Sequence, residues 1–430
     1  MGNKKILLIT TSFYPQNKIS VLRMGQWAKY WNKNGYDVTV LTTKKYDFLD
    51  SLTLNVKLPL NIKIIEIDFL PFFFRSLRKD NSSNKIKSNK IIEQIKFKVR
   101  KLRNYIGSFY DIHDFWISKA TKVGLDLMES KEFTYIVSSY SPAASHVVAK
   151  KIKKKHPNVF WIADFRDLWA FNHLQKGIGF FSFLEKKKER NVLRRVNRIL
   201  TVSDPLTHEM RLNYPNKDVL TVENGFDLDE FPNWKEDIKG DRFLNKKILI
   251  TYAGTIYLGK RDPTILIEAL NELIDDCLLS KEDIKVEFYT NSKNELNQIL
   301  SNNNLNRYEI AKVKGYVSRE VSLKVQKNSD FLLFLEWNHF SARGVLTGKL
   351  FEYLVSGVPI ISIGVNSDFE SGKLIENSGT GLNFTNKEDV KKMLLKVIIE
   401  RKIEFYSPDE KLIECYSREK QSLRIFDNIR

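Results

Sequence analysis

The sequence predicts a two-domain α/β protein in which each domain is built around a parallel β-sheet. A chain of 430 residues is too long for one ordinary hydrophobic core, so two domains of about 200 residues are expected. Short apolar runs alternate with segments of helical periodicity along most of the chain. A polar stretch, residues 232–245, separates two series of such runs. Strands that alternate with helices are typical of doubly wound parallel sheets.

The first half opens with a strand at residues 5–10, a helix from about Ser20 and a strand at residues 37–42, which predict a right-handed βαβ unit. Residues 180–198 read as one basic helix, and Ser203 or Asp204 as the N-cap of the next. Further strands are expected at residues 61–67, 135–139, 158–164 and 198–203, and residues 219–227 are expected to close the domain. Together these elements predict a first domain at residues 1–231.

The second half repeats the pattern and predicts a second domain at residues 246–410. Its first strand, residues 247–254, precedes a helix from Thr264, and Ser318 is expected to cap a later helix. Further strands are expected at residues 284–289, 331–335, 359–362 and 379–384. The tail, residues 411–430, is predicted to end in a helix that begins near Ser417.

The most informative stretch follows the buried strand at residues 331–335. A helix begins near Thr347, and Gly357 and Pro359 end it before the next strand. Thr347, Gly348 and Lys349 at its start predict an anion site, since backbone N–H groups and one cation meet there. Glu352, one turn on, can accept hydrogen bonds from a diol such as a ribose. The alternative is an ordinary helix with solvated Lys and Glu side chains.

The run Gly-Lys-Leu-Phe-Glu-Tyr-Leu-x-Ser-Gly-x-Pro-Ile-Ile, which starts at Gly348, resembles the nucleotide-sugar signature of the family 4 glycosyltransferases. The resemblance implies the retaining type with a GT-B fold, as in bacterial cell-envelope polysaccharide synthesis: two Rossmann-like domains that face a central cleft, with a C-terminal helix that crosses back to the first domain. Glu352 matches the second Glu of the family's Glu-x7-Glu motif, which binds the ribose. Gly344 stands where the first Glu belongs, so that residue's role does not transfer.

The resemblance also implies the other donor-binding residues. In the loop after Gly254, Thr255 replaces a family Arg, whereas Lys260, with Arg261 beside it, matches the Lys that binds the diphosphate. The turn Gly315-Tyr316-Val317 resembles the one that lies against the base, and Leu350 belongs to the signature helix. Lys260 and Lys349 are the expected catalytic cations, because a departing diphosphate develops negative charge that such groups stabilise by about 3–4 kcal/mol each.

In the first domain, polar residues at the ends of strands are the candidates for the acceptor side. Asp164, Arg166 and Asp167 follow a predicted strand, where α/β folds bind ligands, and Tyr14 lies in the first loop. Arg166 and Asp167 are assigned acceptor orientation or sugar contacts and are grouped with the catalytic residues. The alternative is a salt-bridged loop without a ligand.

The net charge of +18 indicates an anionic partner, and half of it falls on one segment. Residues 75–103 hold eleven Lys and Arg against Asp80 and Glu93, within a basic insertion at about residues 70–110. A basic amphipathic helix at residues 91–106, beside the phenylalanines of residues 69–74, favours an anionic membrane surface. The alternative is a domain helix with a solvated basic back.

Several classes of site and location are disfavoured. Two cysteines make no disulfide framework. The six histidines are scattered, and Asp227 and Asp229 read as turn residues, so no metal site is predicted. No Gly-x-Gly-x-x-Gly follows a strand, so no dinucleotide cofactor is expected. No signal peptide or membrane span is recognisable, which predicts a cytoplasmic protein, peripheral on the inner membrane face.

These observations together predict a retaining, metal-independent glycosyltransferase. Its donor would be a UDP- or GDP-linked sugar, with no cofactor, and its acceptor a lipid-linked saccharide or oligosaccharide of a cell-surface polysaccharide such as lipopolysaccharide or capsule. A GT-B sugar-nucleotide epimerase and a catalytically inactive GT-B partner subunit remain as alternatives. A nucleic-acid binder would also explain the charge, but recognisable binding modules are missing, so nucleic acid is not an expected partner.

Overall fold

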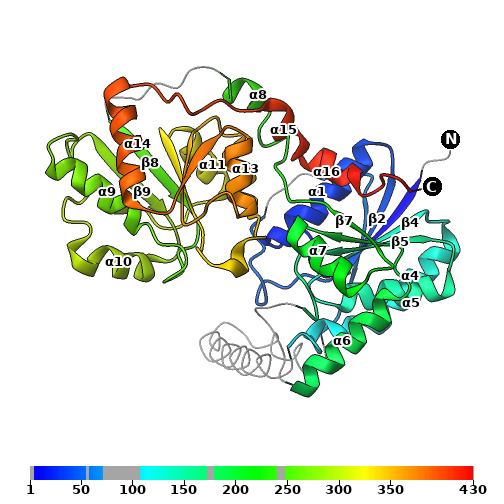
Figure 1. Ribbon diagram of the computed structural model, residues 1–430. Helices are drawn as coiled ribbons and strands as arrows, with labels where there is room; N and C mark the ends of the chain where they lie inside the picture. The colour runs from blue at the N-terminus through cyan, green and yellow to red at the C-terminus, as the bar shows by residue number, and fades with distance from the viewer. Residues whose placement is uncertain (1–3, 55–57, 71–106, 172–178, 240–246, 430) are drawn as a thin grey trace, which may run out of the picture. The chain divides into compact units, whose positions relative to one another are not determined.

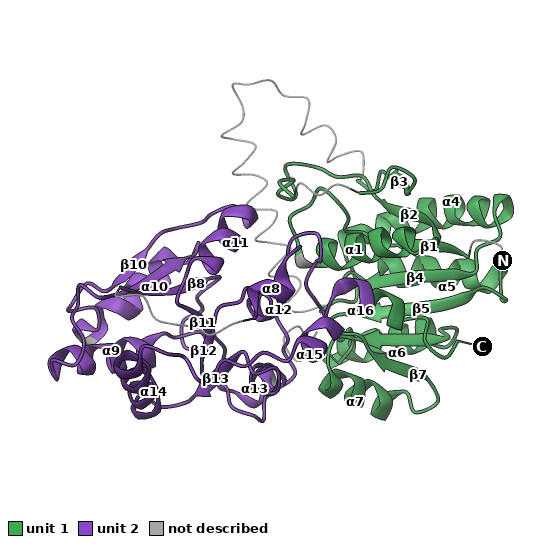
Figure 2. Ribbon diagram, turned by 90° about the horizontal axis from the view of Figure 1, so that it is seen from above, with its two compact units in different colours: residues 1–223, 422–430 green, residues 224–421 purple. Residues whose placement is uncertain are grey.

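The computed structural model describes residues 4–54, 58–70, 107–171, 179–239 and 247–429 (Figure 1). The chain divides into two compact units (Figure 2). Unit 1 comprises residues 1–223 and 422–430, and unit 2 comprises residues 224–421. The chain therefore leaves unit 1 after Glu223 and returns to it at Ser422 for its last nine residues.

In the described part of unit 1, seven parallel strands form one sheet in the order β3-β2-β1-β4-β5-β6-β7. β1 is an inner strand of this order, since Ile6 pairs with Val38 of β2 on one side and with Tyr135 of β4 on the other. The strands are β1 Lys5–Ile9, β2 Asp37–Thr43, β3 Lys63–Ile67, β4 Tyr135–Tyr140, β5 Phe160–Phe165, β6 Arg198–Thr201 and β7 Asp218–Thr221. The helices are α1 Ile19–Lys33, η1 Ile112–Trp116, α4 Ile117–Ser130, α5 Ala144–Lys155, α6 Gly179–Leu193 and α7 Asp204–Asn213.

The described residues of unit 2 form a six-stranded parallel sheet in the order β10-β9-β8-β11-β12-β13. The strands are β8 Ile248–Ala253, β9 Ile284–Tyr289, β10 Ala311–Val313, β11 Phe331–Leu335, β12 Ile360–Ile363 and β13 Gly381–Phe384. The helices are α8 Trp234–Asp237, α9 Thr264–Asp275, α10 Lys293–Ser301, η2 Asn302–Asn304, α11 Arg319–Lys327, η3 Phe340–Ala342, α12 Gly348–Leu354, α13 Glu370–Asn377, α14 Lys387–Glu400 and α15 Glu410–Cys415. α16, Arg418–Arg424, spans the return to unit 1.

Burial explains why the central strands read as unbroken apolar runs. Every residue of β11 is buried, because helices cover both faces of a parallel sheet. In unit 1, Trp27 and Trp31 of α1 pack in the core beneath the returning C-terminus, where Ile425 is fully buried. The returning segment thus contributes Ser422 and Ile425 to the buried interior of unit 1.

Several predicted elements are confirmed and several need correction. Ser318 caps α11 by accepting from the Val321 N–H, and Asp227 accepts from the Asp229 N–H as a turn residue. Ser203 occupies the N-cap position of α7, but its side chain makes no capping hydrogen bond.

Further predictions concern the basic helix α6, the C-terminal tail and the phenylalanines after β3. The basic helix α6 ends at Leu193, since the turn from Leu193 to Val196 leads directly into β6. The helix predicted to begin near Ser417 is α16, which starts at Arg418 and ends at Arg424, and a further short helix, α15, precedes it. Phe69 is buried and stacks on His113, so it is not a membrane-facing residue. The predicted basic helix at residues 91–106 lies outside the described residues.

Candidate functional site

The predicted donor-binding residues of unit 2 meet where the strand order reverses. β8 and β11 are neighbours in the sheet although two strands separate them in sequence. Gly254 follows β8, and Glu336 follows β11, so the loops after both strands leave the same edge of the sheet. In open parallel sheets, this switch point at the carboxyl ends of the strands is where ligands bind.

Lys349 lies at the centre of this edge. The apolar face of α12 is buried, which fixes the start of the helix and directs Lys349 toward β8. Its Nζ lies 4.4 Å from the centroid of the Tyr252 ring. Gly254 makes room for it, because a Cβ built on Gly254 would lie only 1.6 Å from this Nζ. The glycine is therefore required by the close approach of the lysine.

The electrostatic state of Lys349 follows from its surroundings. Burial lowers the pKa of the ammonium to about 7, and the nearby Arg261 guanidinium acts in the same direction, whereas Glu352 and Glu336 oppose it. An anion that approaches Lys349 would therefore stabilise the protonated form of its side chain. Four charged groups thus influence one another at the switch point.

Arg261 and Lys260 occupy different positions in the loop after β8. Arg261 Nη2 lies 3.4 Å from Glu336 Oε2, and the other Glu336 oxygen accepts a 3.1 Å hydrogen bond from the Trp337 N–H. Lys260 Nζ instead lies 4.4 Å from the centroid of the Trp337 ring. The structure thus places Arg261, rather than Lys260, beside Lys349.

Glu352 is held by an arginine that the sequence analysis did not single out. Arg319, the first residue of α11, donates from Nη1 to Glu352 Oε1 over 2.7 Å. Its Nε and Nη2 make a bidentate pair with Glu230, also at 2.7 Å. Burial alone would lower the pKa of Arg319, but the carboxylates of Glu352 and Glu230 raise it. Among the described residues, Glu352 Oε2 accepts no hydrogen bond, which leaves it available to a diol.

The remaining donor-side candidates contribute backbone or lie further away. The carbonyl oxygen of Thr255 accepts a 2.8 Å hydrogen bond from the Tyr252 hydroxyl. Thr347 is the N-cap residue of α12 without a side-chain capping bond, and the helix spans only seven residues. Because the helix is so short, its dipole is a weak anion site, and the side-chain cations carry more of that role.

Two further parts of the predicted signature contribute no charged side chain to the donor side. Gly315, with φ +82°, the exposed Tyr316 and the half-buried Val317 follow the edge strand β10, where Gly315 approaches Lys293. Gly344 follows η3, and a glycine offers no carboxylate to a donor sugar. Leu350 is fully buried and shapes the site only by anchoring α12.

In unit 1, Asp164 is an interior residue. Its side chain is 0% exposed, and Oδ1 accepts a 2.9 Å hydrogen bond from Arg23 Nη2. Oδ2 accepts from the Ser139 hydroxyl at 3.0 Å. Arg23 also donates to the carbonyl oxygens of Val222 and Glu223. Both carboxylate oxygens of Asp164 are therefore engaged in the core, away from any acceptor.

Arg166, Asp167 and Tyr14 lie nearer the surface of unit 1. Arg166 is half-buried and donates from Nε to the Tyr140 carbonyl oxygen over 3.0 Å, and burial lowers the pKa of its guanidinium. Asp167 is exposed. The Tyr14 ring lies directly over Gly25 of α1, where an added Cβ would be 2.1 Å from it. Of these three, Arg166 and Asp167 follow the same strand, β5.

Sequence reasoning missed Arg319, Glu230, Glu336 and Tyr252. Glu336 carried a usable signal, since it is the first charged residue after the apolar strand β11. Tyr252 lies two residues before Gly254 on β8. Arg319 and Glu230 carried no such signal, because 88 intervening residues separate partners that only the fold brings together.

Three general features complete the description. Within the described ranges, no group of three or more His, Cys, Asp or Glu residues is arranged to hold a metal ion. No helix in that part of the chain is both long and apolar enough to cross a membrane. Cys277 and Cys415 are both free and exposed, so the expectation of no disulfide framework holds for the chain's two cysteines.

Comparison with known proteins shows which solved structures share this architecture. A glycosyltransferase from Rickettsia africae ESF-5 matches with a TM-score of 0.60 and 14% identity over 100% of both chains. The apo form of the lipopolysaccharide outer core galactosyltransferase WaaB matches with a TM-score of 0.54 and 14% identity, over 99% of this chain and 100% of that one. A putative UDP-N-acetylglucosamine 2-epimerase from Listeria monocytogenes matches with a TM-score of 0.52 and 11% identity, over 99% and 95%. No protein-family model and no curated protein sequence matches the chain. At these identities the likeness establishes the fold: the chain has the GT-B fold of two Rossmann-like domains, as the sequence predicted.

Proposed function

We propose that this protein is a glycosyltransferase that takes a sugar from a nucleoside-diphosphate sugar bound to unit 2. The observation that carries the proposal is the cluster at the switch point of β8 and β11. There, Lys349 and Arg261 offer positive charge beside Gly254, and Glu352, held by Arg319, offers a free carboxylate oxygen. Cations for a diphosphate and a carboxylate for a ribose are the two groups that a sugar nucleotide requires.

The chemistry assigned to these side chains is electrostatic. When the bond between the anomeric carbon and the diphosphate breaks, negative charge develops on the leaving oxygen. Lys349 and Arg261, with Lys260 at the edge of the loop, stabilise that charge, and one such group typically contributes about 3–4 kcal/mol at the transition state. We propose transfer with retention of configuration and without a metal ion or cofactor.

The acceptor is assigned to unit 1, at the ends of its parallel strands. Arg166 and Asp167 follow β5 at that edge and are proposed to orient an acceptor hydroxyl. A lipid-linked or oligosaccharide acceptor of a cell-surface polysaccharide, reached from the cytoplasmic side of the membrane, fits the net charge of +18. The named activity of WaaB, a protein with the same fold, is of this class.

A screen of sugar nucleotides tests the proposal. Differential scanning fluorimetry with UDP-, GDP-, ADP- and dTDP-linked sugars should find one nucleotide that raises the melting temperature of the wild type. The same nucleotide should leave Lys349→Ala and Glu352→Ala unshifted, although both variants remain folded. A transfer assay with that donor should show turnover in the wild type and at least a hundredfold loss in each variant. Near-normal turnover in both variants would refute the assignment.

The alternative of a sugar-nucleotide epimerase is kept, because a protein of that name shares the fold. An epimerase would convert the donor without any acceptor. A transferase consumes the donor at an appreciable rate only when an acceptor is added. Monitoring donor and product by ion-exchange chromatography, with and without a membrane lipid extract as acceptor, separates the two functions. A sugar nucleotide that binds but never reacts would instead favour the catalytically inactive partner subunit.

A further inference from the structure

The exposed side chains of α6 in unit 1 are those of Phe180, Phe183, Lys187, Arg190 and Asn191, and none of them is acidic. Both acidic residues of this helix point inward: Glu189 accepts hydrogen bonds from the Ala170 N–H and the Tyr214 hydroxyl, and Glu185 accepts one from the Ser108 N–H. At 3.6 residues per turn, the opposite side of the helix carries Phe183, Lys187, Arg190 and Arg194 in one stripe. The fold thus buries both acidic side chains of α6, so that every charged residue on its outer face is basic.

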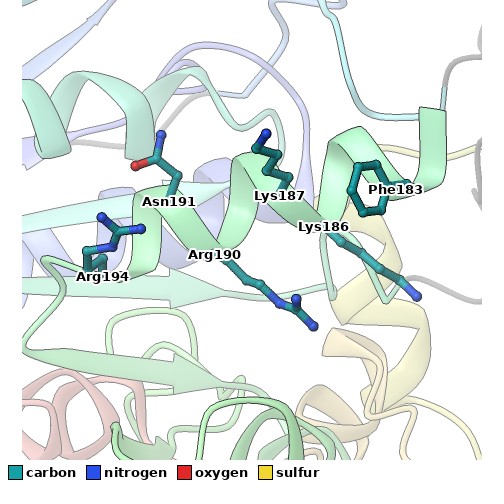
Figure 3. Close-up of a pocket in the computed structure, with 6 residues that line it drawn as sticks. All are labelled: Phe183, Lys186, Lys187, Arg190, Asn191 and Arg194. Atoms are coloured by element: carbon teal, nitrogen blue, oxygen red, sulfur yellow. The ribbon is translucent and has the colours of Figure 1, made fainter. Parts of the chain in front are cut away.

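The first turn of this face is apolar. Phe180 is 69% exposed and Phe183 is 62% exposed, which is unusual for phenylalanine side chains of a folded domain. A hollow of about 540 Å³ lies along the helix from Phe183, and the described residues that line it come from α6 and from Arg194, the residue that follows the helix (Figure 3). Exposed aromatic rings one turn from Lys187 match the arrangement of interfacial helices on lipid.

The positive surface extends from α6 to the neighbouring helix α5. The pKa of Lys150 on α5 is lowered by burial and by the nearby charges of Arg195, Arg194 and Lys154. These side chains are close enough to repel one another, and among the described residues none of them forms an ion pair. Like charges held together without counterions destabilise a fold unless an anionic partner neutralises them.

We propose that this face of unit 1, formed by α6 and the end of α5, docks on an anionic phospholipid bilayer. The basic side chains would contact lipid headgroups, and Phe180 and Phe183 would insert between them. The exposed phenylalanines favour a bilayer over a nucleic acid, because they lie together at one end of the surface rather than between the cations. This inference does not depend on the proposed sugar-nucleotide site, which lies in unit 2.

Vesicle co-sedimentation of the full chain tests the proposal. Vesicles of phosphatidylcholine with 30% phosphatidylglycerol should bind the wild type at low salt, and pure phosphatidylcholine should not. The triple variant Lys187→Gln/Arg190→Gln/Arg194→Gln should bind at least tenfold more weakly. A matched triple variant on unit 2, Lys281→Gln/Lys392→Gln/Lys411→Gln, removes the same charge from exposed positions and should bind like the wild type. Phe180→Ser/Phe183→Ser should release the protein at a lower salt concentration than the wild type needs.

Three outcomes would overturn the proposal. The α6 variant could bind as tightly as the wild type, or both triple variants could weaken binding equally, which would mean that net charge alone matters. The third is a 30-nucleotide DNA or RNA that binds more tightly than the vesicles and loses affinity with the α6 variant but not with the phenylalanine variant. The melting-temperature shift with sugar nucleotide, measured on the same variants, should be unchanged, so a failure here is distinguishable from a failure of the proposed function.

Discussion

Arg319 Nη1 donates a 2.7 Å hydrogen bond to Glu352 Oε1, and the same guanidinium holds Glu230 by two further bonds. This contact fixes the carboxylate to which we assign the ribose. Without Arg319, Glu352 would be free to rotate, and two carboxylates would face each other in a half-buried position. Arg319 is therefore a positioning residue for Glu352.

Replacing Arg319 by Lys should separate geometry from charge. Lysine keeps the positive charge but cannot bridge two carboxylates in a planar fork. We expect Arg319→Lys to weaken sugar-nucleotide affinity about tenfold and to lower the free energy of unfolding by roughly 1–2 kcal/mol. Isothermal titration calorimetry and urea denaturation provide the two readouts. Wild-type affinity in the variant would show that Glu352 does not need this support.

Gly254→Ala should displace Lys349 with little effect on the fold. The new Cβ would meet the Nζ at 1.6 Å, and a flexible side-chain end can move aside at low cost. Affinity for the sugar nucleotide should nevertheless fall at least tenfold, because the cation leaves the phosphate position. The double variant Gly254→Ala/Lys349→Ala is the control: if the glycine acts through the lysine, the two losses do not add. Fully additive losses would contradict this reading.

Lys349 should make sugar-nucleotide binding depend on pH. Its pKa is lowered to about 7, chiefly by burial, so the free protein is increasingly neutral at this position above pH 7. A bound diphosphate favours the protonated form, so the association constant should fall by up to tenfold per pH unit between about pH 7 and pH 9, with proton uptake on binding. A sugar nucleotide is the right probe, since its diphosphate has no group that titrates in this range.

Affinity is a cleaner readout here than stability. Lys45 in unit 1, whose ammonium donates to the Thr42 hydroxyl, also has its pKa lowered to about 7, again first by burial. For both lysines the unfolded chain binds more protons between about pH 7 and pH 10.5, so both make stability rise with pH in that window. The control is Lys349→Met, whose residual affinity should be independent of pH. A wild type with the same affinity at pH 7 and pH 9 would contradict the prediction.

His146 should make unit 1 sensitive to acid. Its Nδ1 lies 2.8 Å from the Ser138 hydroxyl, which also accepts from Trp161, and burial lowers the pKa of the imidazole to about 3. Because the unfolded histidine titrates near 6.5, stability should be lost as the pH falls from about 6.5 toward 3, by up to about 1.4 kcal/mol per pH unit.

Urea denaturation followed by tryptophan fluorescence measures this dependence, since five of the seven tryptophans are buried in unit 1. His146→Leu should have a shallower slope between pH 6.5 and pH 5 than the wild type, and His208→Gln, at an exposed position of α7, should keep the wild-type slope. Parallel curves for the wild type and His146→Leu would refute the assignment.

The returning C-terminus should contribute to the stability of unit 1. Ile425 is fully buried, Trp31 donates to the Ser422 carbonyl oxygen, and Arg198 donates to those of Ile425 and Asp427. Ile425→Ala should lower the free energy of unfolding by about 2–4 kcal/mol. Ile399→Ala, on the exposed side of α14, is the matched control and should change it by less than about 0.5 kcal/mol. Equal effects of the two substitutions would contradict the structure.

Much of the fold could be predicted from the sequence because parallel strands leave a strong pattern. β9 and β11 agree with the predicted ranges residue for residue, since β11 is an unbroken apolar run and β9 begins as an alternation of apolar and charged residues. The end of α6 was misjudged, because Arg194 and Arg195 continue its charged pattern and nothing local marks the turn at Val196.

The site was predictable only where its residues are close in sequence. Lys349 and Glu352 share one helix, and their spacing alone suggested a phosphate and a ribose. Asp164 was assigned to the acceptor side from its place after a strand, but its partner Arg23 is far away in sequence, so the buried ion pair could not be foreseen. The same holds for Arg319 and Glu352, which come together only through packing.

Calorimetric titration of the wild type and of Lys349→Ala and Glu352→Ala with the nucleoside diphosphate of the preferred donor is the decisive measurement for the site in unit 2. We expect one saturable site in the wild type and at least tenfold weaker binding in each variant, with all three proteins folded. If no nucleoside diphosphate binds the wild type, or if both variants bind as it does, unit 2 does not hold a sugar nucleotide at this cluster.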